Sequence, residues 1–230
     1  MRKFSITTSD ERKIELSATV VSAFVVFAIG VMGFVKIAWE LRNEETTMFD
    51  VAVLQVIRQF QSPQLDVFVP VLTDLGGVLV LSALTFVTLA MFVIKKEYRR
   101  AAMVFISMGG AVALNLILKS VFERARPDLW ERLVNESSYS FPSGHAMIAA
   151  AYGLTMIVVL WNSRYRWWAF VFGVAYFIIT GFTRLYLGVH YPTDVVAGWL
   201  VSAAWVAACA LIMQTPRARQ AFRTATKPQG

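Results

Sequence analysis

The chain has few residues with which to carry out chemistry in water. Of its 230 residues one is cysteine and two are histidine, and charged residues make up only 16%. A soluble domain carries about 25% charged residues, so a composition that is 57% hydrophobic excludes an ordinary soluble domain. The single cysteine, Cys209, cannot form an internal disulfide. The chain also lacks a repeat of fixed period and a low-complexity linker, which favours one domain over residues 1–230.

Long hydrophobic runs are abundant instead. A helix that crosses a membrane needs about 20 mostly apolar residues, and six segments of the chain come close to that length. We therefore predict an all-α fold, a polytopic membrane protein in which six transmembrane helices form a bundle. The predicted spans are Leu16–Val35, Leu75–Ile94, Ala101–Leu118, His145–Trp161, Trp167–Thr183 and Val195–Met213.

The distribution of charge predicts how these helices are oriented. Six crossings place both termini on the same side, and cytoplasmic segments carry an excess of Lys and Arg. With the termini inside, the inner segments hold most of the 22 basic residues and the outer segments hold most of the 15 acidic residues. Both termini are therefore predicted to be cytoplasmic, in a multi-pass protein of the plasma or inner membrane. This topology accounts for the net charge of +7, so nucleic acid is not an expected partner.

One further segment, Met48–Gln61, has the pattern of an amphipathic helix. Its predicted apolar face carries Phe49, Val53, Val56, Ile57 and Phe60, and its predicted polar face carries Asp50, Gln55, Arg58, Gln59 and Gln61. Such a helix would lie in the outer membrane interface. A loop helix packed on the bundle is an equally good interpretation, and either would border a lateral entrance for a lipid.

The few polar residues of the predicted bundle fall into three clusters near helix ends. The first cluster, Lys119 with Arg126 and Pro127, follows the third predicted span. An ammonium group and a planar guanidinium both suit phosphate oxygens. Basic residues at helix ends also commonly extend to the membrane surface or interact with the helix dipole, so this cluster alone leaves both interpretations open.

The second cluster, Pro142-Ser143-Gly144-His145, precedes the fourth predicted span. Proline suits a helix start, serine can cap the helix, and glycine lets the backbone approach a ligand closely. Free N–H groups at a helix N-terminus form an anion site, and His145 would exchange a proton with a group bound there. The alternative is an ordinary capped helix whose histidine faces the lipid headgroups.

The third cluster, Arg184, His190 and Asp194, joins the fifth and sixth predicted spans. A carboxylate that accepts a hydrogen bond from one imidazole nitrogen leaves the other nitrogen as a nucleophile. A structural His–Asp pair is the alternative. Under the predicted topology all three clusters lie at outer helix ends, on one face of the membrane. That convergence favours one common site over three separate structural features.

Together the three clusters resemble the signature of the type 2 phosphatidic acid phosphatase superfamily, which includes glucose-6-phosphatases and vanadium haloperoxidases. That family shows Lys-x6-Arg-Pro, then Pro-Ser-Gly-His, then Ser-Arg-x5-His-x3-Asp. The matching residues are Lys119, Arg126 and Pro127 in the first motif, residues 142–145 in the second, and Arg184, His190 and Asp194 in the third. Thr183 stands where the family usually has serine, which keeps a hydroxyl at that position. The motifs span residues 119–194, and the six-helix arrangement extends the resemblance to most of the chain.

The resemblance implies a role for each residue. His190 would attack phosphorus to form a phosphohistidine, Asp194 would orient His190, and His145 would protonate the leaving oxygen and then activate water. Side-chain cations and backbone N–H groups would hold the phosphate oxygens. The residues expected to bind phosphate are Lys119, Arg126, Ser143, Gly144 and Arg184. No cluster has metal-ligand spacing, so neither a metal nor another cofactor is expected.

The expected substrate is an amphiphile with a terminal phosphate or diphosphate, because the site would open at the extracytoplasmic face beside lipid. Bacterial members of the family act on phosphatidylglycerophosphate, phosphatidic acid, diacylglycerol pyrophosphate, undecaprenyl pyrophosphate or lipid A phosphates. We expect a phospholipid or isoprenoid phosphatase whose partners are its lipid phosphate and the surrounding membrane lipids. A lipid A phosphatase or phosphotransferase, a phosphatase for a soluble sugar phosphate and a non-catalytic lipid transporter are alternatives. The motifs do not choose the lipid, and they do not predict the oligomeric state.

Overall fold

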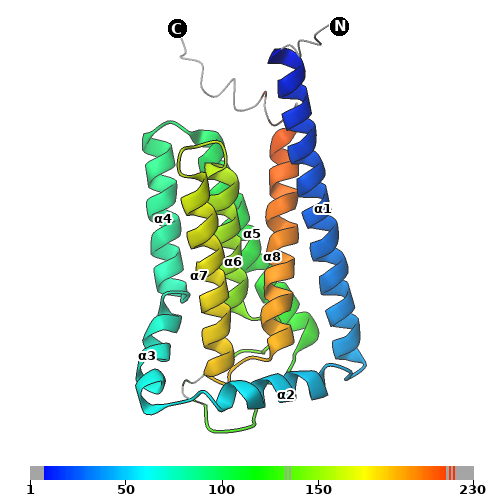
Figure 1. Cartoon of the computed structure of the whole chain (residues 1–230), viewed down its shortest axis with the longest axis vertical. Helices are drawn as coiled ribbons and strands as arrows, with labels where there is room; N and C mark the ends of the chain where they lie inside the picture. Colours follow the sequence, from blue (N-terminus) through cyan, green and yellow to red (C-terminus); the bar gives the residue numbers. More distant parts are fainter. Residues whose placement is uncertain (1–7, 133, 135, 216–217, 219, 221–230) are drawn as a thin grey trace, which may run out of the picture.

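The computed structural model describes residues 8–132, 134, 136–215, 218 and 220. Within these residues all regular secondary structure is helical (Figure 1), which confirms the predicted all-α class. The helices are α1 (Thr8–Arg42), α2 (Thr47–Arg58), α3 (Pro63–Asp74), α4 (Val78–Ile94), α5 (Tyr98–Phe122), α6 (Gly144–Leu160), α7 (Arg166–Tyr186) and α8 (Pro192–Gln214).

Five helical segments of the described chain are long and apolar enough to cross a membrane. They are Ala18–Arg42, Pro63–Ile94, Tyr98–Phe122, Arg166–Tyr186 and Pro192–Gln214, and each overlaps one predicted span. The remaining predicted span, His145–Trp161, forms the apolar helix α6, which has only 17 residues. The structure therefore confirms five of the six spans as long apolar helices. The sixth crossing and the side on which the termini lie remain predictions.

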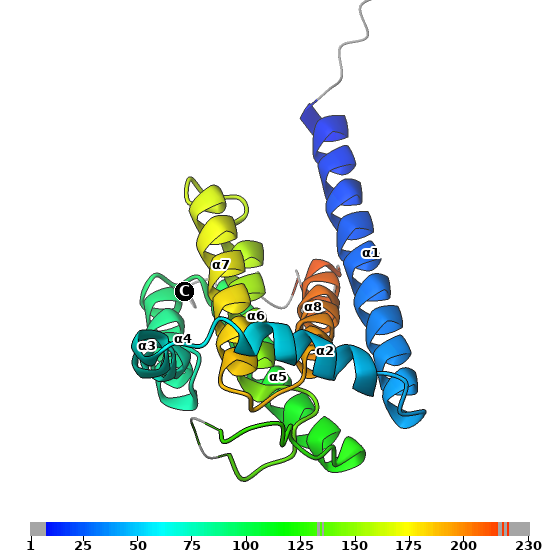
Figure 2. The ribbon, with the colours of Figure 1, turned by 60° about the horizontal axis from the view of Figure 1, so that its bottom comes forward.

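Helix α6 lies at the centre of the bundle and packs against α5, α7 and α8 (Figures 1 and 2). Its small residues allow this, because Ala149–Ala151 are fully buried and Gly153 faces Gly173 of α7. A Cβ atom on Gly153 would lie 2.6 Å from the Gly173 carbonyl oxygen. Small residues let membrane helices approach this closely. The close packing of α6 holds its N-terminal residues, Gly144 and His145, in place.

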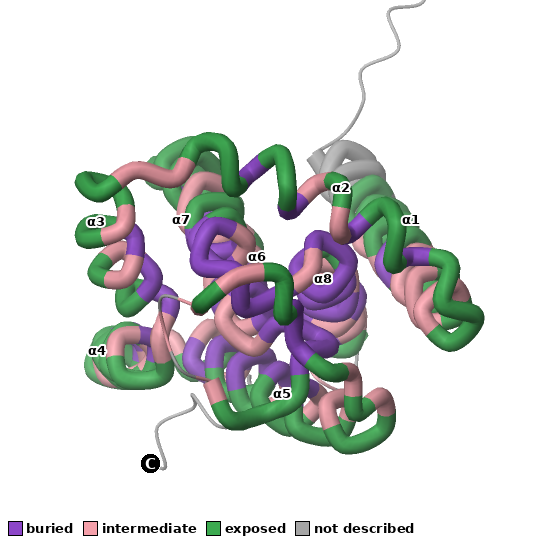
Figure 3. Tube along the Cα trace, turned by 90° about the horizontal axis from the view of Figure 1, so that it is seen from below, coloured by how far each residue is buried: buried purple, intermediate pink, exposed green. Residues whose placement is uncertain are grey.

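The outside of the bundle is apolar. Buried residues gather around α6 and α8, whereas α1, α3 and α4 expose most of their surface (Figure 3). The exposed residues include large apolar side chains such as Phe24, Leu79 and Trp168. An apolar surface of this extent marks contact with a membrane rather than with water.

The chain before α4 contains a helix that was not predicted. Helix α3 begins at Pro63, a favoured first helical residue, and the Ser62 hydroxyl accepts the N–H of Leu65 at 3.4 Å. It ends at Asp74, before the Gly76–Gly77 pair that separates it from α4. Helix α3 packs on α7, and this contact brings the end of α3 to the third motif.

Helix α2 lies across one end of the bundle (Figures 1 and 3) and contacts α7 and α8. The prediction of a helix here is confirmed, but the assignment of Asp50 to its polar face is wrong. Asp50, predicted on the polar face, is fully buried together with Leu54 and Ile57, because it has ionic partners inside the bundle. The surface that points away from the bundle carries the apolar residues Phe49, Val56 and Phe60, which are 61%, 54% and 66% exposed, beside the exposed polar residues Gln55, Arg58 and Gln59.

The three motifs meet at the same end of the bundle as α2 (Figure 2). The connection between α5 and α6, residues 123–143, and the short connection between α7 and α8, residues 187–191, both lie at this end. The C-terminal end of α8 lies at the opposite end (Figure 1). The prediction that the motif residues share one end of the bundle therefore agrees with the structure.

Candidate active site

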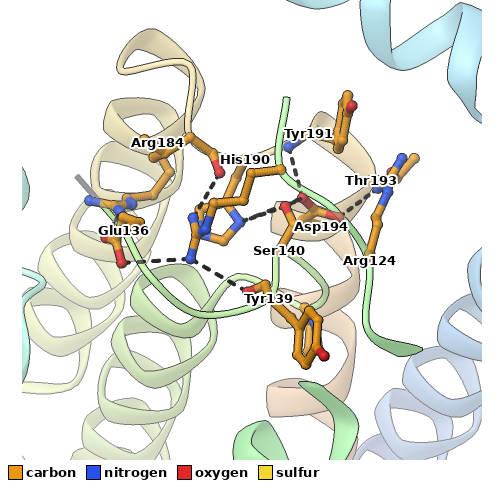
Figure 4. A network of polar contacts seen from close by, with 12 residues as sticks. Arg124, Glu136, Tyr139, Ser140, Arg184, His190, Tyr191, Thr193 and Asp194 are labelled. Atoms are coloured by element: carbon orange, nitrogen blue, oxygen red, sulfur yellow. Dashed lines mark hydrogen bonds and ion pairs between the residues drawn. The ribbon is translucent and has the colours of Figure 1, made fainter. Parts of the chain in front are cut away.

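His190 and Asp194 form a buried pair at the junction of α7 and α8 (Figure 4). His190 is 1% exposed, Asp194 is fully buried, and Nδ1 of His190 lies 3.5 Å from Oδ2 of Asp194. The Tyr191 N–H donates to the same oxygen at 2.8 Å. Pro192 begins the helix, so Asp194 occupies the position from which a carboxylate accepts the N–H of the capping residue. Local helix geometry thus places the carboxylate beside the imidazole.

Ser140 completes the surroundings of Nδ1. Its hydroxyl donates a short hydrogen bond to Oδ2 of Asp194 and lies 3.3 Å from Nδ1 of His190. Sequence reasoning missed this residue, because a serine just before the second motif resembles any loop serine. Its position becomes visible only when the loop folds over the third motif.

Arg126 contacts the other imidazole nitrogen. Its Nη1 lies 3.1 Å from Nε2 of His190 and donates to the Val189 carbonyl at 2.8 Å, while its Nε donates to the Ser138 carbonyl at 2.7 Å. A guanidinium has donors only, so Nε2 must be the acceptor and the ring proton must be on Nδ1, facing Asp194. This tautomer leaves an unprotonated lone pair on Nε2, which is the form a nucleophile requires.

The charge state of His190 supports the same assignment. Burial lowers the pKa of His190 from 6.5 to about 3, the positive charges of Arg126 and Arg184 act in the same direction, and Asp194 opposes them. His190 is therefore neutral at physiological pH.

Arg126 and Arg184 share a carboxylate. Glu136 accepts a short hydrogen bond from Nη2 of Arg184 and lies 3.6 Å from Nη2 of Arg126. Burial raises the pKa of Glu136, but the positive charges of Arg184 and Arg126 outweigh that effect and hold this pKa below its ordinary value. Two of the predicted phosphate-binding residues thus already converge on a single anionic group. Sequence reasoning did not identify Glu136, whose partners lie elsewhere along the chain.

Lys119 joins this group from the last turn of α5. Its Nζ donates to Oγ of Ser138 at 2.7 Å, and Nη2 of Arg126 donates to the same hydroxyl at 3.2 Å. On the other side, Nη1 of Arg184 donates to the Thr73 hydroxyl at 3.0 Å. The Thr183 hydroxyl lies 2.9 Å from that of Thr73, so the residue that departs from the family pattern still places a hydroxyl beside the partner of Arg184.

The second motif begins α6. Ser143 is the residue before the helix, but its side chain makes no capping hydrogen bond, so the expected serine cap is wrong. Its N–H donates to the Asp194 carbonyl at 3.0 Å, which links the second motif to the third. The N–H groups of Gly144 and His145 belong to the first helical turn, lack acceptors within the helix and suit an anion. His145 is half-buried. The charged groups close enough to interact with it electrostatically are Arg184, Glu136, Lys119 and Arg126.

Asn115 of α5 contacts the second motif. Its Nδ2 donates to the Pro142 carbonyl at 3.2 Å. A Cβ atom on Gly144 would lie 3.1 Å from Oδ1 of Asn115, which is a tight contact. Glycine therefore allows the start of α6 to pack closely against α5.

A second ionic network lies behind Asp194. Nη1 of Arg124 donates to Oδ1 of Asp194 at 2.5 Å, and its Nη2 donates to Oδ2 of Asp50 at 2.7 Å. Thr193 donates to Asp50 through its N–H at 3.0 Å and its hydroxyl at 2.6 Å. Burial lowers the pKa of Arg124, but the Asp194 and Asp50 carboxylates more than offset this and raise it above its ordinary value. Sequence reasoning assigned no role to either Arg124 or Asp50.

No group of three or more His, Cys, Asp or Glu side chains could hold a metal ion in the part of the chain that the structure describes. The expectation that the reaction needs neither a metal nor a cofactor stays a prediction, which activity in the presence of EDTA would test.

These features define a class of protein. An apolar helical bundle holds, at one end, a neutral histidine that a carboxylate orients and that Arg126 contacts, with Arg184 and Lys119 in the same network of polar contacts. This is the arrangement of a membrane enzyme acting on phosphate groups. A family model of the PAP2 superfamily matches residues 100–218. The chain belongs to the PAP2 superfamily and is a membrane-bound phosphatase of that family.

The individual relatives agree with this assignment. Phosphatidylglycerophosphatase B of Bacillus subtilis is 30% identical over 172 residues, which cover 72% of this chain and 84% of the relative. An undecaprenyl-diphosphatase of Sulfolobus acidocaldarius is 29% identical over 128 residues, covering 52% of this chain and 58% of the relative. The crystal structure of a transmembrane PAP2 type phosphatidylglycerolphosphate phosphatase from Bacillus subtilis superposes with a TM-score of 0.69 at 27% identity, over 92% of this chain and 99% of that one. The structure of Aquifex aeolicus LpxE gives a TM-score of 0.56 at 25% identity, over 71% and 93% of the two chains.

Proposed function

We propose that the protein hydrolyses the terminal phosphate or diphosphate of a phospholipid or isoprenoid lipid, through a phosphohistidine on His190, at the extracytoplasmic face of the membrane. The observation that carries this proposal is the state of His190. Its Nδ1 faces Asp194 and Ser140, while its unprotonated Nε2 faces Arg126. A neutral, oriented imidazole beside phosphate-binding cations is suited to attack phosphorus.

In the first step, the lone pair on Nε2 forms a bond to phosphorus, and the bond between phosphorus and the leaving oxygen breaks. His145 begins this step protonated, donates its proton to that oxygen and becomes neutral. Arg126 exchanges its contact with Nε2 for a phosphoryl oxygen, and Lys119 and Arg184 bind the remaining oxygens. The phosphate replaces Glu136 as the anionic partner of Arg126 and Arg184.

In the second step, water attacks phosphorus and the nitrogen–phosphorus bond breaks, which returns the electron pair to Nε2. His145 accepts the proton that the water loses, so it acts as an acid and then as a base. Between the two steps the imidazole ring is cationic, and the negative charge of Asp194 stabilises it. The N–H groups of Gly144 and His145 are suited to the phosphoryl oxygens in both steps.

Two observations support a lipid as the substrate. The site lies at the end of an apolar bundle, and α2 exposes Phe49, Val56 and Phe60 at that same end, so an amphiphile can approach from the membrane. The names of the relatives point to the same chemical class, a phosphate or diphosphate on a lipid. The distribution of Lys and Arg along the chain supports the extracytoplasmic position of the site.

The test is phosphate release by the purified protein from a panel of substrates. The panel contains phosphatidylglycerophosphate, phosphatidic acid, undecaprenyl diphosphate, a lipid A phosphate and glucose 6-phosphate. We expect release from at least one lipid, and none from a folded His190→Ala variant. Release from the sugar phosphate alone, or turnover by the variant close to that of the wild type, would contradict the proposal.

A further inference from the structure

The network behind Asp194 carries an inference that rests on the proposed function and deepens it. We propose that Asp50 and Arg124 are positioning residues for phosphoryl transfer, in which Asp50 balances the charge of Arg124 so that the negative charge of Asp194 remains directed at His190. Neither residue is a defining position of the three motifs.

Arg124 fixes how the Asp194 carboxylate is turned. Its guanidinium takes Oδ1, at 2.5 Å, and leaves Oδ2 for the Ser140 hydroxyl, the Tyr191 N–H and the His190 ring. The Cζ atom of Arg124 lies 4.0 Å from the centroid of the Tyr191 ring, so the guanidinium is held on its flat face as well as at its edge. The two oxygens of Asp194 therefore have different partners, and only Oδ2 faces the nucleophile.

Asp50 balances the positive charge of Arg124, so that Arg124 does not neutralise Asp194. A guanidinium paired with Asp194 alone would neutralise it, and a neutral pair would stabilise a cationic imidazole poorly. Asp50 accepts from the other side of the same guanidinium at 2.7 Å, and both carboxylates are fully buried. The three groups together retain one net negative charge beside His190. That charge is needed when Nε2 bonds to phosphorus and the ring becomes cationic.

Asp50 could act as a structural anchor between two helices or as a positioning residue, and the two roles predict different effects. Asp50 comes from α2, which the motifs do not include, and it reaches the start of α8 through two hydrogen bonds from Thr193. A purely structural Asp50 would fasten α2 to α8 and would affect folding and rate alike. A positioning residue affects the rate of phosphoryl transfer and leaves substrate binding unchanged.

The test compares Asp50→Asn, Arg124→Met and the double variant, by kcat, KM and melting temperature with one lipid phosphate. For Asp50→Asn we expect kcat to fall about tenfold and KM to change by less than about twofold, because Arg124 then neutralises Asp194. Arg124→Met alone leaves the buried carboxylates of Asp50 and Asp194 without the cation between them, which favours protonation of one of the two and lowers kcat. The double variant leaves Asp194 charged and without a carboxylate neighbour, so it should be faster than either single variant. Such a rescue cannot come from two independent losses.

Two further variants separate charge from anchoring. Thr193→Val removes the hydroxyl that donates to Asp50 at 2.6 Å and accepts from Nη1 of Arg124 at 2.8 Å, but it leaves every charge. We expect its kcat to stay within about threefold of the wild type. Asp66→Asn removes a carboxylate of α3 that accepts from Tyr186 at 2.7 Å, and it should leave kcat unchanged. A Thr193→Val variant as slow as Asp50→Asn would contradict the proposal.

The outcomes also distinguish this inference from the proposed function. Wild-type protein that releases no phosphate from any lipid phosphate contradicts the proposed function itself. If the wild-type protein is active, the proposed function stands. This inference alone is then contradicted if Asp50→Asn keeps a normal kcat, or if the double variant is slower than Arg124→Met. The comparison of the double variant with Arg124→Met remains informative even if the single variant Asp50→Asn does not fold.

Discussion

At the scale of single residues, the reactivity of His190 follows from which neighbour each ring nitrogen faces. Asp194 and Ser140 lie at Nδ1, and Arg126 lies at Nε2. A histidine in water is half protonated near pH 6.5, whereas burial keeps this one neutral. The same burial that would make the residue look like core packing is thus what prepares it for nucleophilic attack.

The lowered pKa of His190 predicts the pH dependence of the reaction. Because the pKa falls to about 3, the unprotonated form predominates at every pH above that value, and His190 should cause no loss of rate between pH 5 and 7. The measurement is kcat/KM against pH, corrected for ionisation of the substrate phosphate. An acid limb centred near pH 6.5 after that correction would show that His190 titrates as an ordinary histidine.

The residues that sequence reasoning found and missed differ in how far their partners lie along the chain. The predicted topology placed Arg126, His190 and Asp194 at one face of the membrane, and their match to the family motifs predicted that they share a site. Asp50 was assigned to the polar face of its helix, since no local pattern distinguishes a solvated carboxylate from one that pairs with a distant guanidinium. Glu136 was missed for the same reason.

At the scale of secondary structure elements, hydrophobic runs located the long helices well. A polar backbone in a membrane must satisfy its hydrogen bonds internally, so a long apolar run has almost no other conformation available. Helix α3 escaped prediction because Asp66, Pro70 and Asp74 interrupt its apolar sequence. In α2 only Asp50 was assigned to the wrong side, because it lies on the buried side of the helix with Leu54 and Ile57.

The contact between α6 and α7 predicts a sensitive glycine. A Cβ atom on Gly153 would lie 2.6 Å from the Gly173 carbonyl oxygen, whereas one on Gly109 would meet nothing within 4 Å. Gly153→Ala should separate the helices, displace His145 and lower the melting temperature by about 5 °C, as overpacking typically costs about 1–3 kcal/mol. Gly109→Ala is the matched control and should be neutral or slightly stabilising. Equal melting temperatures for the two variants would mean that the backbones do not touch.

At the scale of the whole molecule, the polar site lies at one end of an apolar bundle. Charge distribution predicts that this end faces away from the cytoplasm. Two exposed loop residues test the orientation, Leu129 at the site end and Tyr165 in the connection between α6 and α7. In a Cys209→Ala background, a membrane-impermeant thiol reagent on intact cells should label Leu129→Cys and spare Tyr165→Cys. The reverse pattern would place the site in the cytoplasm.

The central claim is that His190 forms a covalent bond to the phosphoryl group. The most direct measurement is a rapid quench of purified protein after mixing with a lipid phosphate labelled in its terminal phosphate, followed by peptide mapping. We predict a label that is stable in alkali and labile in acid, as expected for a phosphohistidine, on the peptide that contains His190 and absent from His190→Ala. A label on another residue, or normal turnover with no covalent label on the millisecond scale, would contradict the account.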